Sequence, residues 1–425
     1  MINISIIMPV YNTAMYLGKS IGSLLKQTYG YFELICVNDA SSDASLAVLE
    51  EFKGQDSRIV IINHENNYGA AVSRNDGLKI AKGEYVIFLD SDDFFYRDNM
   101  LEELYKYASD NCADIVLYGS EYTDKTSTQK KKIAYQFEII DSLEKKAFFL
   151  PKMRHAPWDK LVRRRILLEN NICFQNILTN NDIFFSYATV MSAKKMVVCD
   201  QVLAEYGDFQ KGRAGSLTTL RFSRFNYTVE AFYAVYTFCN RQNIERYLKT
   251  VFMNILLDNI QMYLSEKMYS VEMRHSSLNH LLEYSDLMNE LKVRLSDNSL
   301  YPHNEDFAKK LVDGGDVCSM EYMQYYANGL ENIILRTKSQ NKKTALWGCG
   351  HNGKRLIDVM QTHNLVIDYV VDENKELQGK SYGKYIIYPY DDVSEDIDII
   401  WITNLAFKDV IEERAVGKEV IYVWQ

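Results

Sequence analysis

The chain has 425 residues, of which 47% are hydrophobic and 25% charged, with a formal net charge of −9. This balance is typical of a folded globular protein of two or three domains and excludes wholesale disorder. The acidic charge argues against nucleic acid as the main partner. No apolar stretch reaches the roughly 20 residues of a membrane-spanning helix.

Residues 1–100 alternate between strand and helix patterns. Four short apolar runs, rich in β-branched residues, predict strands, and the segments between them have helical spacing. This alternation predicts an α/β fold with a doubly wound, mostly parallel sheet and helices on both of its faces. The predicted strands are Ile4–Val10, Phe32–Val37, Ile59–Ile62 and Tyr85–Leu89, and the predicted helices are Tyr16–Gln27, Leu46–Phe52 and Ala70–Ala81.

The later part of the chain divides into a helical segment and a second α/β pattern. Helical apolar spacing is found in Phe225–Tyr236, Ile244–Leu264 and Tyr322–Leu335, and a new strand pattern begins at Thr344. We therefore expect three domains: the doubly wound domain at 1–222, a helical domain at 223–338 and a small Rossmann-like domain at 339–425.

The seven cysteines are widely spaced, and no C-x-x-C pair or Cys/His cluster is present. Neither a zinc site nor a disulfide scaffold is expected. The chain enters its first strand pattern without the basic region and cleavage site of a secretory signal. We therefore expect a cytoplasmic protein with reduced thiols, either free or at the inner face of the membrane.

Polar residues gather where the predicted strands end. Asp90, Ser91 and Asp92 follow the fourth strand, and Asp39 follows the second. In a doubly wound sheet, ligands bind at the carboxyl ends of the strands. Two carboxylates separated by one residue can ligate Mn²⁺ or Mg²⁺ and leave positions open for a diphosphate. Arg74, in the third predicted helix, lies where it can face a phosphate.

Each of these residues also has a purely structural interpretation. Asp90 and Asp92 could form a solvated turn or cap the next helix, since aspartate is a favourable N-cap residue. Asp39 could be a turn residue, and Arg74 could be the partner in a surface ion pair. Tyr11 could be a packing aromatic residue.

Four motifs occur in order along the first quarter of the chain: Met8–Asn12, Val37–Asp43, Ala71–Gly77 and Leu89–Asp93. Together they resemble the family 2 nucleotide-sugar glycosyltransferases of the GT-A fold, and the resemblance covers roughly residues 1–220. It implies that the donor is a UDP-sugar and that a divalent cation assists the reaction.

The resemblance also implies a role for each matching residue. Pro9 and Tyr11 would line the nucleotide pocket, and Asp39 would form a hydrogen bond with the uracil. Arg74 would face the nucleotide or diphosphate. Asp90, beside Ser91, would hold the ribose or the water shell of the metal, and Asp92 would ligate the metal directly.

Downstream motifs continue the resemblance. Trp158 and Asp159 match a segment beside the acceptor cleft, and Arg213 matches a loop that closes over the donor diphosphate. Asp182 matches the general base of inverting members. The preceding residue is Asn181 where the family carries glutamate, so the role of that glutamate is not transferred.

The implied reaction is inverting transfer of one sugar from a UDP-sugar to a hydroxyl of a glycan, lipid-linked saccharide or glycoprotein. The Gln-x-x-Arg-Trp signature of processive synthases is absent, which favours a single addition. Asp182 could instead cap the helix that begins near Ile183. Two other functions remain open: a sugar-phosphate nucleotidyltransferase, although Pro9–Asn12 replaces its glycine-rich loop, and a non-catalytic nucleotide-binding scaffold.

Two further features have both a functional and a structural interpretation. Gly348, Gly350 and Gly353, followed by Asp372, have the spacing of a dinucleotide-binding loop, but the segment is short, and a structural or homo-oligomerising role is also expected. The basic clusters Lys130–Lys132 and Arg163–Arg165 could be solvated surface or could contact an anionic membrane.

Overall fold

The structure, a computed structural model, describes residues 2–123, 130–133, 139–205, 225–264, 278–297, 299–300, 302–314, 317, 342–349, 353, 357, 366–402, 411 and 413–422. The chain divides into two compact units, Met1–Leu256 and Leu257–Gln425. In the described residues, no helix is both long enough and apolar enough to cross a membrane.

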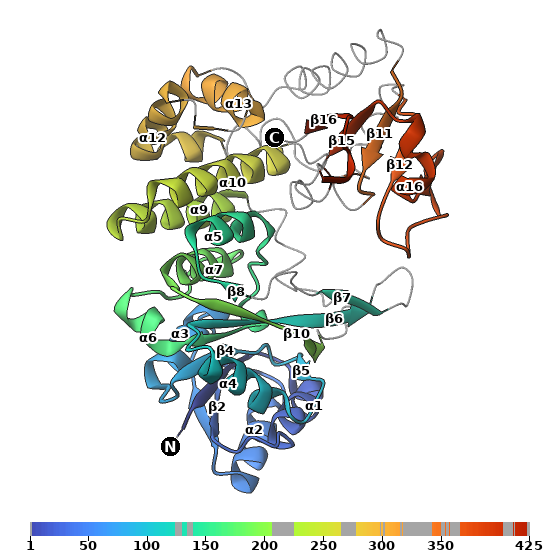
Figure 1. The fold of residues 1–425 in the computed structure, drawn as a ribbon. Helices are drawn as coiled ribbons and strands as arrows, with labels where there is room; N and C mark the ends of the chain where they lie inside the picture. Colours follow the sequence, from blue (N-terminus) through green and yellow to red (C-terminus); the bar gives the residue numbers. More distant parts are fainter. Residues whose placement is uncertain are drawn as a thin grey trace. The chain divides into compact units, whose positions relative to one another are not determined.

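The first unit is built around a ten-stranded sheet (Figure 1). Its strands are β1 (Ile4–Val10), β2 (Phe32–Asn38), β3 (Ile59–Asn63), β4 (Tyr85–Phe88), β5 (Phe94–Phe95), β6 (Ile115–Thr123), β7 (Lys130–Ile133), β8 (Ile139–Ile140), β9 (Lys160–Arg163) and β10 (Met196–Glu205). The main order is β3-β2-β1-β4-β9-β6-β10-β5. β1 to β4 are parallel, whereas β9 is antiparallel to both of its neighbours, β4 and β6.

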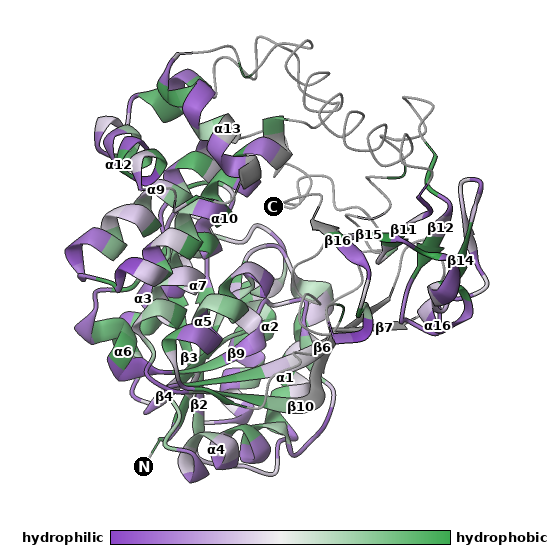
Figure 2. Cartoon of the chain, turned by 45° about the horizontal axis from the view of Figure 1, so that its top comes forward, coloured by the Kyte–Doolittle hydropathy of each residue, from purple (hydrophilic) through white to green (hydrophobic). Residues whose placement is uncertain are grey.

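Helices cover both faces of this sheet because its central strands are apolar on both sides. All seven residues of β2 are buried. On one face, side chains of α1 (Ala14–Leu25), α2 (Ser45–Gln55) and α4 (Met100–Asp110) share a core with Ile4, Ile6 and Met8. Figure 2 shows the strands as largely hydrophobic, whereas the helices carry both hydrophobic and hydrophilic residues.

The opposite face carries α3 (Ala70–Ile80) and α7 (Asn181–Ser192). α3 packs so closely on β1 that a Cβ atom at Gly77 would lie 2.5 Å from Cγ2 of Ile7. Phe185 of α7 stacks on Phe174 with ring centroids 4.2 Å apart, and Phe174 in turn contacts Phe88 of β4. These contacts hold both helices against the parallel strands of the sheet.

The remaining helical elements of this unit follow the sheet. They are α5 (Leu143–Phe149), η1 (Leu150–Lys152), η2 (Pro157–Asp159), α6 (Arg164–Glu169), α9 (Phe225–Arg241) and the first part of α10 (Arg246–Leu264). α9 packs against α7, with Phe184 and Phe238 in edge contact and a hydrogen bond from the Asn180 side-chain amide to the Thr228 hydroxyl.

The second unit contains helices and a smaller sheet. Its elements are α12 (Ser285–Ser296), α13 (Pro302–Val312), β11 (Thr344–Trp347), β12 (Tyr369–Val371), β13 (Ser381–Tyr382), β14 (Tyr385–Tyr388), α16 (Tyr390–Val393), η4 (Ser394–Asp396), β15 (Ile399–Ile402) and β16 (Glu419–Tyr422). The strand order is β13-β14-β12-β11-β15-β16, parallel except for β13. Apolar clusters lie on both faces of the sheet.

These observations confirm the predicted fold class: a doubly wound, mostly parallel sheet, then helices, then a small Rossmann-like α/β sheet. The three domain boundaries stay a prediction. The predicted helix at Tyr322–Leu335 lies outside the described residues.

Candidate active site

The strand order places the candidate site at the carboxyl ends of the parallel strands. The order of the strands reverses at β1, with β2 and β3 on one side and β4 on the other, and in doubly wound sheets ligands bind at this switch point. Tyr11 follows β1, Asp39 follows β2, and Asp90 lies just beyond the end of β4. Pro9 is half-buried, and Tyr11 is 48% exposed. Exposed at this edge, the Tyr11 ring can cover an aromatic base.

The loops after β1 and β2 are joined by hydrogen bonds. The side-chain oxygen of Asn12 accepts from the amide of Ser42 at 2.8 Å, and Asp43 accepts from the amides of Ala14 and Ser45 at 3.1 and 2.9 Å. Burial alone would raise the pKa of Asp43, but the hydrogen bonds from Ser45 and Ala14 outweigh it and lower that pKa below its usual value. The two loops therefore form one rigid rim.

Asp39 is buried at the start of α3. Its carboxylate accepts from the amides of Tyr68 and Gly69 at 2.9 and 2.7 Å, and its own amide donates to the carbonyl of Val10. Gly69 has a φ of 89°, a conformation that favours glycine. Asp39 thus holds the two residues that lead into α3, Tyr68 and the N-cap residue Gly69.

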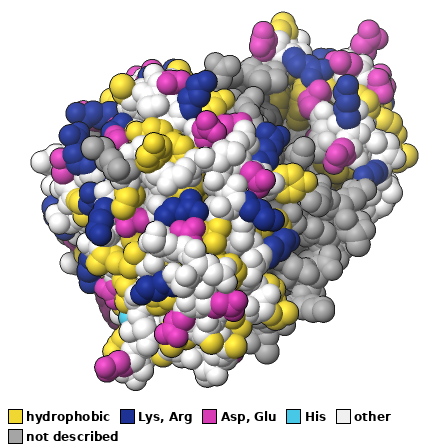
Figure 3. Space-filling view, turned by 90° about the horizontal axis from the view of Figure 1, so that it is seen from below, with side chains coloured by type: hydrophobic (Ala, Val, Ile, Leu, Met, Phe, Trp, Pro, Cys, Tyr) yellow, Lys and Arg dark blue, Asp and Glu magenta, His cyan; other side chains and the backbone are white. Residues whose placement is uncertain are grey.

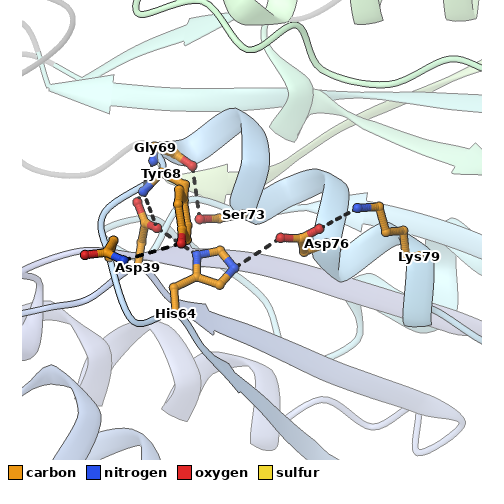
Figure 4. Close-up of polar contacts among 8 residues, drawn as sticks. Asp39, His64, Tyr68, Gly69, Ser73, Asp76 and Lys79 are labelled. Atoms are coloured by element: carbon orange, nitrogen blue, oxygen red, sulfur yellow. Dashed lines mark hydrogen bonds and ion pairs between the residues drawn. The ribbon is translucent and has the colours of Figure 1, made fainter.

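Sequence reasoning did not single out His64, which meets Asp39 in this site. Its Nδ1 lies 2.8 Å from Oδ1 of Asp39, and its Nε2 lies 3.2 Å from Oδ2 of Asp76 (Figure 4). The available signal was position, because His64 directly follows β3 at the same sheet edge. Asp76 carried no such signal, since it lies inside α3.

Arg74 connects the fourth strand to α7. Its Nη2 donates to Oδ1 of Asp90 at 2.6 Å, and its Nη1 donates to the side-chain oxygen of Asn181 at 3.4 Å. The Arg74 side chain is 8% exposed and lies over the ring of Phe174. Its Nε atom is buried and lacks a hydrogen-bond partner among the described residues. The two hydrogen bonds to Asp90 and Asn181 use only part of the donor capacity of the guanidinium, which has five N–H groups.

Asn75, the residue after Arg74, has a structural role. The Asn75 side chain donates to the carbonyl of Phe174 and accepts from its amide, both at 2.8 Å. This paired hydrogen bond holds Phe174 against α3. It therefore fixes the ring over which the Arg74 guanidinium lies.

Asp182 lies in the first turn of α7, half-buried, next to the Asn181 that contacts Arg74. The helix begins at Asn181, and its N-cap is Asn180, in a left-handed conformation with φ of 60°. Asp182 is therefore not the N-cap residue. Asn181, the residue before it, contacts Arg74, and Arg74 in turn pairs with Asp90.

Asp90 and Asp92 offer a donor set that fits a hard cation. Both are partly exposed at the strand end, while Ser91 between them is buried. Carboxylate oxygens suit Mg²⁺ and Mn²⁺. In the described ranges, no cluster of three or more His, Cys, Asp or Glu side chains is suited to a metal. A cation held by these two carboxylates would have its other coordination positions open to substrate and water.

The predicted acceptor residues lie inside the first unit. Trp158 is 6% exposed and Asp159 is fully buried. Asp159 forms an ion pair with Lys160 at 2.5 Å, and the Arg154 guanidinium lies over the Trp158 ring. Lys160 also donates to the carbonyl of Ala156, which ties the ion pair to its own segment. The acceptor role of Trp158 and Asp159 stays a prediction, and Arg213 lies outside the described residues.

The glycine loop of the second unit is closed by its acidic residue. Gly348 has a φ of 97°, and Oδ2 of Asp372 accepts from the amide of Cys349 at 2.6 Å. Oδ1 of Asp372 accepts from the amide of Asn374 at 2.8 Å. Both oxygens of Asp372 therefore serve the fold, and nucleotide binding at this loop stays a prediction. Gly350 lies outside the described residues.

Several known proteins are similar in sequence to this chain, and the similarity includes the first unit. The family model "Glycosyl transferase family 2" matches residues 5–170. Glycosyltransferase GlyG of Streptococcus pneumoniae serotype 4 is 29% identical over 311 residues, which are 68% of this chain and 95% of that protein. An uncharacterized glycosyltransferase of Haemophilus influenzae is 36% identical over 173 residues, which are 36% of this chain and 68% of that protein.

The fold of this chain is also found in a solved structure. A crystal structure of S. aureus TarS 1–349 in complex with UDP has a TM-score of 0.60 and 19% identity, and the match covers 76% of this chain and 92% of that chain. A second family model, "C2185-like, N-terminal", matches residues 340–421. The fold and its strand-end residues define a GT-A-type enzyme. The chain belongs to glycosyl transferase family 2, and it is a glycosyltransferase.

Proposed function

We propose that this enzyme transfers one sugar from a UDP-sugar to a hydroxyl of a saccharide or glycoconjugate acceptor, with inversion and with a divalent cation. The observation that carries the proposal is the Arg74 bridge. One buried guanidinium contacts both Asp90, at the end of β4, and Asn181, the residue before Asp182. It therefore ties a carboxylate suited to the donor to the helix turn that carries the candidate base.

On the donor side, Pro9 and Tyr11 border the base, and Asp39 accepts a hydrogen bond from it. Asp90 and Ser91 face the ribose side, and the Arg74 guanidinium donates to a phosphate oxygen. Arg213 is proposed as a second cationic contact. The UDP bound by the TarS fragment of similar fold supports the choice of nucleotide.

On the acceptor side, Asp182 removes the proton from the attacking hydroxyl as that oxygen reaches the anomeric carbon. The attack comes from the face opposite the diphosphate, so the configuration inverts in one displacement. Trp158 and Asp159 are proposed to shape the acceptor cleft. Because both are buried, they would act by holding the backbone of their segment in place.

The proposed cation is Mn²⁺ or Mg²⁺, held by Asp92 and Asp90. When bound, it supplies positive charge that offsets the charge of the departing diphosphate. Before the cation binds, Arg74 offsets part of the charge of Asp90, because Nη2 of Arg74 lies 2.6 Å from Oδ1 of Asp90.

A panel of nucleotide-sugars, tested for binding and for hydrolysis with and without Mn²⁺, tests this proposal. We expect UDP-sugars to bind and to be hydrolysed slowly in the presence of the metal. Binding of GDP- or CDP-sugars alone would contradict the donor assignment. An NAD(P) cofactor bound in place of every nucleotide-sugar would contradict the proposal as a whole.

We also propose peripheral membrane contact, through the basic cluster Arg163–Arg165, and homo-oligomerisation. The cluster Arg163–Arg165 is partly committed to the fold: Arg163 pairs with Glu84 and Asp114, and Arg164 donates to the carbonyl of Gly83. On the face seen in Figure 3, basic side chains are interspersed with acidic ones. Arg165 is the exposed member of the cluster, with 74% of its side chain accessible.

A further inference from the structure

His64 links two carboxylates that lie in different elements. Asp39 follows β2 and Asp76 belongs to α3, and each places an oxygen within hydrogen-bond distance of one nitrogen of the His64 ring (Figure 4). The His64 side chain is 7% exposed and that of Asp39 is 3% exposed. The far oxygen of Asp76 accepts from Nζ of Lys79 at 2.7 Å.

The chemistry of this chain of contacts is restrictive. Carboxylate oxygens accept hydrogen bonds, and each nitrogen of the His64 ring lies within hydrogen-bond distance of one carboxylate oxygen. The ring therefore holds the Asp39 carboxylate in a fixed position relative to Asp76 of α3.

The same contacts restrict what Asp39 can recognise. A carboxylate has about four lone-pair sites, and the amides of Tyr68 and Gly69 and the ring of His64 occupy three of them. The remaining site accepts from one donor. Uracil offers an N3–H to such an acceptor, whereas cytosine has an unprotonated N3 and would face it with a second acceptor.

We infer that His64 is a positioning residue that sets the nucleobase selectivity of this enzyme by holding Asp39 in place as an acceptor with a single open site. Asp76 orients His64 from α3. Because Arg74 lies on the same helix two residues earlier, the chain of contacts also fixes the base-recognising carboxylate relative to the phosphate-facing guanidinium. The inference rests on the proposed use of a uridine nucleotide.

The test compares UDP and CDP binding, by calorimetry with Mn²⁺ present, in the full chain and in matched variants. In His64→Asn the amide nitrogen replaces Nδ1 and retains the contact with Asp39. In His64→Gln the amide nitrogen replaces Nε2 and retains only the contact with Asp76. Asp76→Asn leaves the histidine itself intact. His280→Gln is the matched control, because His280 also has a partner at each ring nitrogen, Glu283 and Tyr284.

We expect the native chain to prefer UDP over CDP by about tenfold or more, since a buried acceptor facing another acceptor loses a hydrogen bond. His64→Gln should weaken UDP binding about tenfold and remove most of the preference. His64→Asn and His280→Gln should keep the preference. Asp76→Asn should reduce it, because His64 then loses its orienting partner.

Several results would overturn the inference. Retention of the native UDP-to-CDP ratio in a folded His64→Gln variant would show that His64 does not set selectivity. If that variant fails to fold by circular dichroism, an unchanged ratio in Asp76→Asn has the same meaning. A native chain that binds neither nucleotide contradicts the proposed function itself, whereas a selective native chain with unaffected variants contradicts only the role of His64.

Discussion

Asp182 lies in the first turn of α7, and the residue before it, Asn181, contacts Arg74. Asp182→Asn should lower turnover about 10²- to 10⁴-fold, the usual range for the loss of a general base, and leave UDP binding within about threefold. The loss of a first-turn carboxylate alone costs a helix about 0.3–1 kcal/mol. Steady-state kinetics with the identified acceptor, together with UDP titration, checks this.

A second substitution separates catalysis from helix stability. Asp286→Asn removes an equivalent first-turn carboxylate from α12, in the other unit. It should change stability by a similar small amount and leave turnover unchanged. Near-normal turnover in Asp182→Asn, or equal losses in both variants, would contradict the role of Asp182 as the base.

The cysteines allow a prediction that needs no substrate. Cys112 and Cys173 are exposed, whereas Cys36, Cys199, Cys239 and Cys349 are buried. Burial raises the pKa of Cys36 and of Cys239 to about 12. Because the thiolate is the reactive form, we expect Cys112 and Cys173 to react with iodoacetamide at pH 8 in the native state. The four buried thiols should react only after unfolding, as peptide mass mapping would show.

At the scale of elements, the packing of α3 on β1 determines where Arg74 and Asp76 lie. Gly77→Ala would place a Cβ atom 2.5 Å from Cγ2 of Ile7, so the helix or the strand must shift. Overpacking of this kind costs about 1–3 kcal/mol. We expect a lower free energy of unfolding in urea and weaker UDP binding.

Gly18→Ala is the matched control for this substitution. Gly18 lies within α1 and is exposed, and a Cβ atom added there would have open space around it. Alanine there should stabilise the protein by about 0.5–1 kcal/mol, because it removes the conformational entropy of a helical glycine. If both variants changed stability in the same direction, close packing at Gly77 would not explain the effect.

The elements that sequence reasoning located best are those with a strong local pattern. β1 begins and ends at the predicted residues, and α3 ends one residue before the predicted end. A strand such as β1 has a continuous apolar pattern because it has apolar neighbours on both faces of the sheet. By contrast, the burial of Asp159 with Lys160 depends on packing by other elements, which no local pattern records.

The sequence likewise predicts some residues of the candidate site and not others. Asp39, Arg74 and Asp90 could be found because each stands in an ordered motif at a strand end or helix start. The contact between His64 and Asp76 could not, because it depends on how α3 lies relative to the loop after β3 in three dimensions. The family resemblance implies that Asp39 contacts the base, but no sequence pattern indicates that Asp39 also accepts hydrogen bonds from the two residues before α3.

At the scale of the whole molecule, the formal charge of −9 provides no general positive field for a diphosphate, so we expect specific groups to supply the positive charge. Arg74 and Arg213 are two proposed sources, and the proposed cation on Asp90 and Asp92 is a third. Treatment with EDTA should therefore reduce transfer at least about 100-fold, and Mn²⁺ or Mg²⁺ should restore it. Asp92→Asn should raise the metal concentration needed for half-maximal activity. Full turnover in EDTA would contradict the metal assignment.

The double task of Asp39 has a consequence for how this enzyme can diverge. The carboxylate that is proposed to read the base also holds the two residues that lead into α3, Tyr68 and Gly69. A mutation that changes the nucleobase preference at this position would therefore also loosen a helix, and most such variants would be lost to misfolding before a new preference could be selected. We expect lineages descended from this chain to explore new sugars and acceptors far more readily than new nucleotides.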